Sequence, residues 1–310
     1  MSVLGSEILI NDQTDDSFNC NDSHDDIEVP ESIVQAREEW KEIDKQQEEL
    51  DKLHKEIGVG GIVIDRSTPM TYFDTRLFLI EQSSRLNSNV PQIVFSSKNC
   101  CCFPKGIPFS VSDGWKELYL SSRLAFDEND VVHHRILNSL HSSITGIKTP
   151  PPRKGSHWTD VGFQSEDPIK DLRSTGMLGL ALPLAVFSKF KPFGQRVISI
   201  SRSPDHPFPL MLIMIVFVGN ALDVAKNTDL FIGVTDKEGV WNQIVYFLAG
   251  SIYQLCLEWV RDGLDFIEDY QRIAKIMKNA SFSIKNTIDN GILAENEETK
   301  SIHMIGEDGH

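Results

Sequence analysis

Apolar residues recur at helical spacing through most of the second half of the chain. They return every three or four positions around residues 182–190, 207–225, 240–260 and 264–277, as on one face of an α-helix. Alternation at every second position, which is typical of a strand, is clear only in the sequence RVISIS at residues 196–201. The pattern predicts an all-α fold, with strand character confined to this one stretch.

Two amphipathic helices are predicted ahead of this region. The first covers residues 30–57 and ends at Gly58. Its apolar stripe suits packing on a partner helix or on this chain's own domain. The chain's own domain is at least as well supported, because the stripe spans too few heptads for a coiled coil. The second covers residues 131–144, with an acidic start and Gly146 as its stop. Between them, residues 58–114 are rich in glycine and proline, and we expect irregular structure with one or two short elements.

The longest apolar run, residues 208–218, predicts a buried core helix. A bilayer span needs about 20 apolar residues, and this run is shorter and contains Pro209. Another proline, Pro183, lies in the apolar segment before it. Because proline costs about 3 kcal/mol inside a helix but is tolerated in the first turn, we expect that helix to start near Leu180.

Charge is concentrated at the N-terminus. The formal net charge is −15, and residues 1–56 hold 17 acidic and 5 basic residues, a net charge of −12. An acidic chain without a basic cluster argues against nucleic-acid binding and against electrostatic docking on anionic membranes. Residues 1–29 hold few large apolar groups, so we expect a disordered acidic tail there, and a polar C-terminal tail at residues 286–310.

Metal, disulfide and targeting signals are weak. The N-terminus has no cationic start followed by an apolar stretch, so we expect a cytoplasmic protein. Three adjacent cysteines at residues 100–102 suit palmitoylation or, more simply, ordinary loop thiols. Three histidines, His133, His134 and His141, have no metal-ligand partners at the required spacing, and we expect surface or capping roles for them.

One segment carries a dense pattern just before the apolar helices. It holds a tryptophan, a Gly-Phe-Gln triplet, a proline, an aspartate, a lone arginine and a glycine at fixed spacing: Trp158, Gly162, Phe163, Gln164, Pro168, Asp171, Arg173 and Gly176. This segment, residues 158–176, is called the signature segment below. It resembles the signature of the ELMO domain, and the likeness extends more weakly over the helices on both sides.

The resemblance implies a helical ELMO domain and a division of the chain. We expect the ELMO domain at residues 127–285, preceded by an N-terminal extension at residues 30–126 with the amphipathic helix and an irregular linker. ELMO proteins of this small size resemble GTPase-activating proteins for Arf and Arf-like GTPases. Such a protein regulates another protein's GTP hydrolysis rather than acting through its own substrate pocket, and needs no metal or cofactor, because GTP and magnesium belong to the GTPase.

Within that resemblance, Arg173 is expected to be an arginine finger that Asp171 orients. An arginine is always charged and offers planar donors to the phosphate oxygens of the transition state. Taken alone, the spacing also suits a structural ion pair between Asp171 and Arg173. Trp158 and Phe163 are expected to be buried, and Gln164 to hold the loop by a hydrogen bond.

Two departures from the family pattern keep a second function open. Lys170 stands where the family usually has threonine, and Ser174 where it commonly has glycine. Both flank Arg173. The alternative is a non-catalytic adaptor that binds a small GTPase, an exchange factor or a cytoskeletal partner, with a location at the periphery of membranes or the cytoskeleton.

Overall fold

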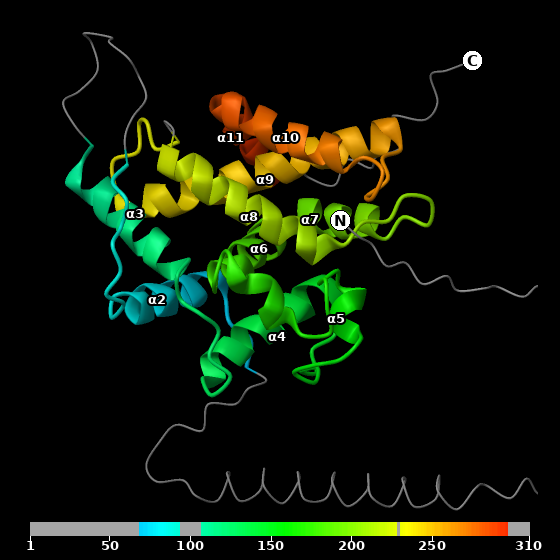
Figure 1. Ribbon diagram of the computed structural model, residues 1–310, viewed down its shortest axis with the longest axis horizontal. Coiled ribbons are helices and arrows are strands. Elements are labelled where there is room, and N and C mark those ends of the chain that lie inside the picture. The colour runs from blue at the N-terminus through cyan, green and yellow to red at the C-terminus, as the bar shows by residue number, and fades with distance from the viewer. Residues whose placement is uncertain (1–67, 94–106, 228–229, 297–310) are drawn as a thin grey trace, which may run out of the picture. The chain divides into compact units, whose positions relative to one another are not determined.

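The computed structural model describes residues 68–93, 107–227 and 230–296 (Figure 1). Within these ranges every regular element is a helix, as the apolar pattern predicts. The elements are α2 (Tyr72–Ser83), α3 (Phe109–Ser121), α4 (Val131–Thr145), α5 (His157–Asp160), the 3₁₀ helix η1 (Pro168–Arg173), α6 (Leu178–Lys189), α7 (Lys191–Ser201), α8 (Leu210–Asn227), α9 (Lys237–Asp262), α10 (Tyr270–Phe282) and α11 (Ile284–Glu295). The acidic tail, the helix expected at residues 30–57 and the cysteines at 100–102 lie outside the described residues.

Helix α6 lies at the centre of the fold. Every residue from Leu178 to Phe187 is buried, and α2, α4, α7, α8 and α9 all pack against it (Figure 1). A helix that is apolar on all sides is stable only when other elements surround it. Since the signature segment leads directly into α6, the core fixes the position of that segment.

The start of α6 differs from the expectation. The helix begins at Leu178 rather than near Leu180, so Pro183 lies in the helix interior and not in its first turn. Proline removes one backbone hydrogen bond there. Burial of the apolar side chains around Pro183 offsets that loss, which a local rule about proline does not take into account.

Helix α9 runs between α8 and the pair formed by α10 and α11 (Figure 1). Its contact with α11 is close because Gly250 faces the Thr287 carbonyl and Gly291 faces the Tyr246 carbonyl, with no room for a Cβ atom at either glycine. The prediction of a polar tail at residues 286–310 is therefore wrong for residues 286–295. Residues 286–295 belong to α11, whose Thr287, Gly291 and Ala294 are buried.

Described helices on both sides of the expected ELMO domain, residues 127–285, pack on its helices. The described part of residues 68–296 clusters as one unit. In the stretch expected to be irregular with one or two short elements, α2 packs on α3 and α6, and α3 packs on α9. Local signals support α2, because the Thr71 side chain accepts a hydrogen bond from the Asp74 backbone and caps the helix.

Two other expectations are wrong in detail. Residues 196–201 belong to helix α7 and not to a strand, because the buried residues Phe193, Val197 and Ser201 recur every four positions. His133 and His141 are buried rather than on the surface, with 3% and 4% of their area exposed. Burial lowers the pKa of both imidazoles.

The remaining long helices follow the predictions. Asp130 caps α4 by accepting from the Val132 backbone, and Gly146 ends it in the left-handed conformation. Helix α8 contains the longest apolar run from Leu210 onward and lies in the core, and α9 covers the expected range. Helix α10 starts at Tyr270, later than expected. No described helix has the length and apolar content that crossing a membrane requires.

Candidate functional site: the signature turn

Trp158 anchors the start of the signature segment. Its side chain is 1% exposed, and its indole Nε1 donates to the Pro152 carbonyl at 3.1 Å. The ring makes edge contacts with His141 and Phe163, with centroids 5.3 Å and 5.8 Å away. Trp158 and Phe163 are both buried, as expected, so both serve the core rather than a partner surface.

Gly162 brings the segment against the start of α8. Its φ of +90° is one that residues with a Cβ rarely adopt, and a Cβ atom would overlap the Leu210 backbone nitrogen. The Gly162 carbonyl accepts from the Leu212 backbone at 2.8 Å. The glycine is therefore required for a backbone-to-backbone contact between residues far apart in the chain.

The turn at the start of helix η1 is held by a proline and by an ion pair. Pro168 occupies its first turn and is buried, and the Asp167 side chain accepts from the Ile169 backbone at 3.3 Å. Asp167 also pairs with Arg153 at 2.7 Å. Burial would raise the pKa of Asp167, but the Arg153 hydrogen bond and charge outweigh it and lower the pKa below its ordinary value.

Asp171 ties η1 to the preceding loop. Its Oδ2 atom accepts from the Gln164 backbone N–H at 2.7 Å, while the Gln164 side chain is exposed. Gln164 thus holds the loop through its backbone and not its amide side chain. Burial, the main cause, together with the nearby charge of Asp167 raises the pKa of Asp171. Among the described residues, Asp171 makes no hydrogen bond or ion pair with Arg173.

The end of the segment rests on helix α3. Gly176 has a φ of +52°, and a Cβ atom there would lie 2.5 Å from the Ser122 carbonyl oxygen and 2.6 Å from that of Leu124. The next residue, Met177, donates its backbone N–H to the Leu124 carbonyl at 2.8 Å. Sequence analysis does not predict this contact, because α3 lies in the N-terminal extension that was expected to contain an irregular linker.

Arg173 differs from the other members of the signature. It is exposed, although Leu172 before it and Thr175 after it are buried. Its guanidinium has no hydrogen bond or ion pair with any described residue, and its charge only lowers the pKa of Asp171 slightly against the effect of burial. Lys170 and Ser174 are also exposed. The turn therefore presents an arginine on a backbone that is fixed on both sides.

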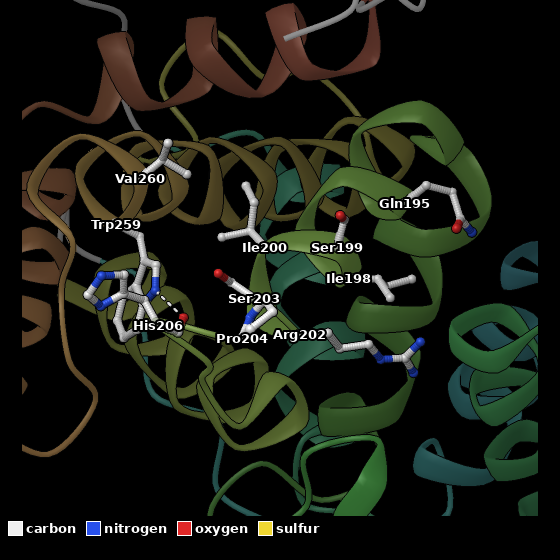
Figure 2. A pocket seen from close by; sticks show the side chains of 10 residues that line it. All are labelled: Gln195, Ile198, Ser199, Ile200, Arg202, Ser203, Pro204, His206, Trp259 and Val260. Atoms are coloured by element: carbon white, nitrogen blue, oxygen red, sulfur yellow. Dashed lines mark hydrogen bonds between the residues drawn. The ribbon is translucent and has the colours of Figure 1, made fainter. Parts of the chain in front are cut away.

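A groove in the described part lies away from the signature turn. It has a volume of about 710 Å³ and lies between the last turns of α7 and α9 (Figure 2). Its polar residues include Ser199, Ser203 and His206, but no serine is hydrogen-bonded to the imidazole, and the His206 contact drawn in Figure 2 is its carbonyl accepting from Trp259 Nε1 at 2.9 Å. This groove lacks the nucleophile and base pairing of a hydrolase. The described residues also include no cluster of metal-ligating side chains.

Fold and site together define a class of protein: an all-helical domain that displays one arginine on a rigid turn leading into its central helix. Residues 116–240 match the family model of the ELMO/CED-12 family. The signature segment lies inside this match, which starts within α3 rather than at residue 127. Over these residues the chain is similar to the ELMO/CED-12 family.

Similar proteins were found in mammals. The ELMO domain-containing protein 3 of Homo sapiens is 25% identical over 234 residues, which are 74% of this chain and 61% of that protein. The ELMO domain-containing protein 3 of Mus musculus is 24% identical over 265 residues, 80% of this chain and 67% of its own length. The ELMO domain-containing protein 2 of Bos taurus is 28% identical over 122 residues, 38% of this chain and 41% of that protein.

The match therefore spans less than two thirds of the human relative's length. No solved structure matches the chain.

Proposed function

We propose that this protein is a GTPase-activating protein for an Arf or Arf-like small GTPase, to which it supplies Arg173 in trans. Similarity to the ELMO/CED-12 family supports a role in the regulation of small GTPases. One observation carries the finer proposal: Arg173 is the signature residue with a charged, exposed side chain and no structural partner among the described residues. The other members of the signature are buried, are glycines, or take part in the hydrogen bond between the Gln164 backbone N–H and the Asp171 carboxylate.

The chemistry suits such a group. Negative charge on the phosphate oxygens must be stabilised in the transition state of GTP hydrolysis, and the GTPase supplies its own magnesium and lysine. An added arginine is worth about 10³- to 10⁵-fold in rate. Buried Leu172 and Thr175 fix the backbone around Arg173, so little ordering of the main chain is needed when the side chain enters the nucleotide pocket.

An adaptor that binds a GTPase without accelerating hydrolysis is the second candidate. The exposed side chains of Lys170 and Ser174, which replace the usual family residues beside Arg173, favour it. They would change the surface that a GTPase contacts beside Arg173.

The experiment that separates the two is single-turnover GTP hydrolysis by a panel of Arf and Arf-like GTPases, with and without this protein. We expect at least about a tenfold acceleration for one member, far below the limit for an arginine finger. Tight binding to a GTP-loaded member without acceleration would establish the adaptor instead. If no GTPase of the panel binds this protein or is accelerated by it, both candidate functions are excluded.

A further inference from the structure

A second exposed arginine lies beside the signature turn. Arg123 follows Ser122, the C-cap residue of α3, and its side chain is exposed. Its neighbours Ser122 and Leu124 are the residues whose carbonyl oxygens contact Gly176. Arg123 and Arg173 are far apart in sequence but flank the same backbone contact, and neither guanidinium has a hydrogen bond or ion pair with another described residue.

The backbone that carries Arg123 is as well held as the one that carries Arg173. The Arg123 N–H donates to the Leu120 carbonyl at 2.9 Å, and the Ser122 hydroxyl donates to the Tyr119 carbonyl at 2.6 Å. The Met177 N–H joins this turn to the start of α6 through the Leu124 carbonyl. The backbone segments that carry the two arginines are therefore joined directly at this contact.

Positive charge is grouped on this surface. Arg123, Lys170 and Arg173 are exposed here without an ion pair to any described residue. Two other exposed arginines are paired, Arg85 with Glu81 and Arg261 with Asp262, whereas Arg202 is exposed without an ion pair to a described residue. Unpaired arginines on one surface suit a negatively charged partner, because planar guanidinium donors match carboxylate geometry.

We propose that Arg123 is a second contact for the GTPase and binds carboxylates at the rim of its nucleotide pocket while Arg173 reaches the phosphates. This inference rests on the proposed function and adds a residue that sets affinity and partner choice. A rim charge acts mainly on association rate and salt dependence, whereas an arginine finger acts on the chemical step. The two arginines should therefore affect different kinetic constants.

The test compares Arg123→Glu with the wild-type chain on the GTPase that responds best in the panel. With the GTPase loaded with a non-hydrolysable GTP analogue, we expect the Kd to rise at least about tenfold and its salt dependence to weaken. The rate of hydrolysis at saturating protein should stay within about twofold of wild type, since the finger is intact. Arg123→Lys keeps the charge and should retain most of the affinity.

Lys226→Glu is the matched control. Lys226 is exposed in the last turn of α8, so its reversal changes the net charge equally and removes a cation from a helix C-terminus, as Arg123→Glu does at the end of α3. We expect binding by this control within about twofold of wild type. Urea unfolding of both variants should show losses of stability below about 1 kcal/mol, the size of one interaction with a helix dipole.

Each contrary result has a distinct meaning. Two results overturn this inference and leave the proposed function standing. In the first, Arg123→Glu binds the GTPase as tightly as the wild type while Arg173→Ala loses acceleration. In the second, Arg123→Glu loses affinity for anionic lipid vesicles but keeps its affinity for the GTPase. A loss confined to the GTP-analogue form and absent with GDP points to a phosphate contact and overturns the carboxylate assignment. An equal loss in Lys226→Glu overturns it as a general charge effect. Full acceleration in Arg173→Ala removes the finger assignment, and no binding by wild type removes both.

Discussion

The Asp171 carboxylate is hydrogen-bonded to the backbone N–H of Gln164 at 2.7 Å and not to the guanidinium of Arg173. This bond joins η1 to the loop that contains Gly162 and Phe163. Arg173 follows Asp171 by two residues, so the bond holds the backbone from which the arginine extends. Asp171 therefore acts on the position of Arg173 through the main chain.

Two substitutions at Asp171 distinguish this role from direct orientation of the guanidinium. Asn keeps an oxygen that can accept from Gln164, whereas Ala removes it. We expect Asp171→Ala to lower the maximal rate of stimulated GTP hydrolysis about tenfold, since small displacements of a catalytic group are costly, and Asp171→Asn to stay within about threefold of wild type. The measurement is single-turnover hydrolysis at saturating protein. Equal damage by both variants would show that the negative charge itself orients Arg173.

Arg173→Lys retains the charge of Arg173 and removes its planar fork. A compact ammonium does not span the phosphate oxygens as a guanidinium does, so we expect the acceleration to fall by about tenfold to a hundredfold. Folding and GTPase binding should be preserved, because the side chain is exposed and has no structural partner among the described residues. Unchanged acceleration in a folded Arg173→Lys protein would falsify the finger assignment and favour the adaptor.

Trp158→Ala tests the anchor of the signature segment. The side chain is 1% exposed and packs on His141 and Phe163, so its removal should cost about 3 to 5 kcal/mol in the free energy of unfolding. Urea unfolding measures this loss. Trp158→Phe keeps much of the packing but loses the bond to the Pro152 carbonyl, and should cost less than Ala. A stable Trp158→Ala protein that no longer binds its partner would instead make Trp158 a contact residue.

Gly162→Ala and Gly146→Ala form a matched pair. Both glycines have positive φ, +90° and +75°, but a Cβ atom at Gly162 meets the α8 backbone, whereas one at Gly146 meets nothing within 4 Å. Gly146→Ala should lower the free energy of unfolding by about 1 to 2 kcal/mol, the cost of holding a residue with a Cβ atom in the left-handed backbone conformation. Gly162→Ala adds steric overlap of about 1 to 3 kcal/mol and should lower thermal stability further. Similar melting temperatures for the two variants would argue against the close approach.

The pair of Asp167 and Arg153 predicts a pH dependence of stability. The folded state lowers the pKa of Asp167 below its ordinary value of 3.8, so the unfolded chain binds the proton more readily. The stabilisation is complete above the ordinary pKa and is lost as the pH falls through the folded value. We expect Asp167→Asn to cost about 1 to 2 kcal/mol at pH 7 and progressively less below about pH 4. A difference that is constant from pH 7 to pH 3 in urea unfolding would contradict this.

Much of the fold follows from local pattern. Helices α4, α8 and α9 were predictable because each has an apolar stripe of helical period, and α4 also has an N-cap at Asp130 and a stop at Gly146. Helix α7 was missed because a short run that alternates at two residues also contains positions four apart. Helix α11 was missed because its core face consists of small residues, Thr287, Gly291 and Ala294, which a search for large apolar groups does not detect.

The sequence by itself determined the all-helical class, the long apolar helices and the fixed spacing that singles out Arg173, because these depend on residues that are close along the chain. Tertiary structure alone decided that α2, α3 and α11 share the core, that Asp171 bonds to Gln164, and that Arg123 lies beside the signature turn. Those relationships depend on the approach of segments distant in sequence, such as Gly176 against Ser122, and only the packing of the helices around α6 brings them together.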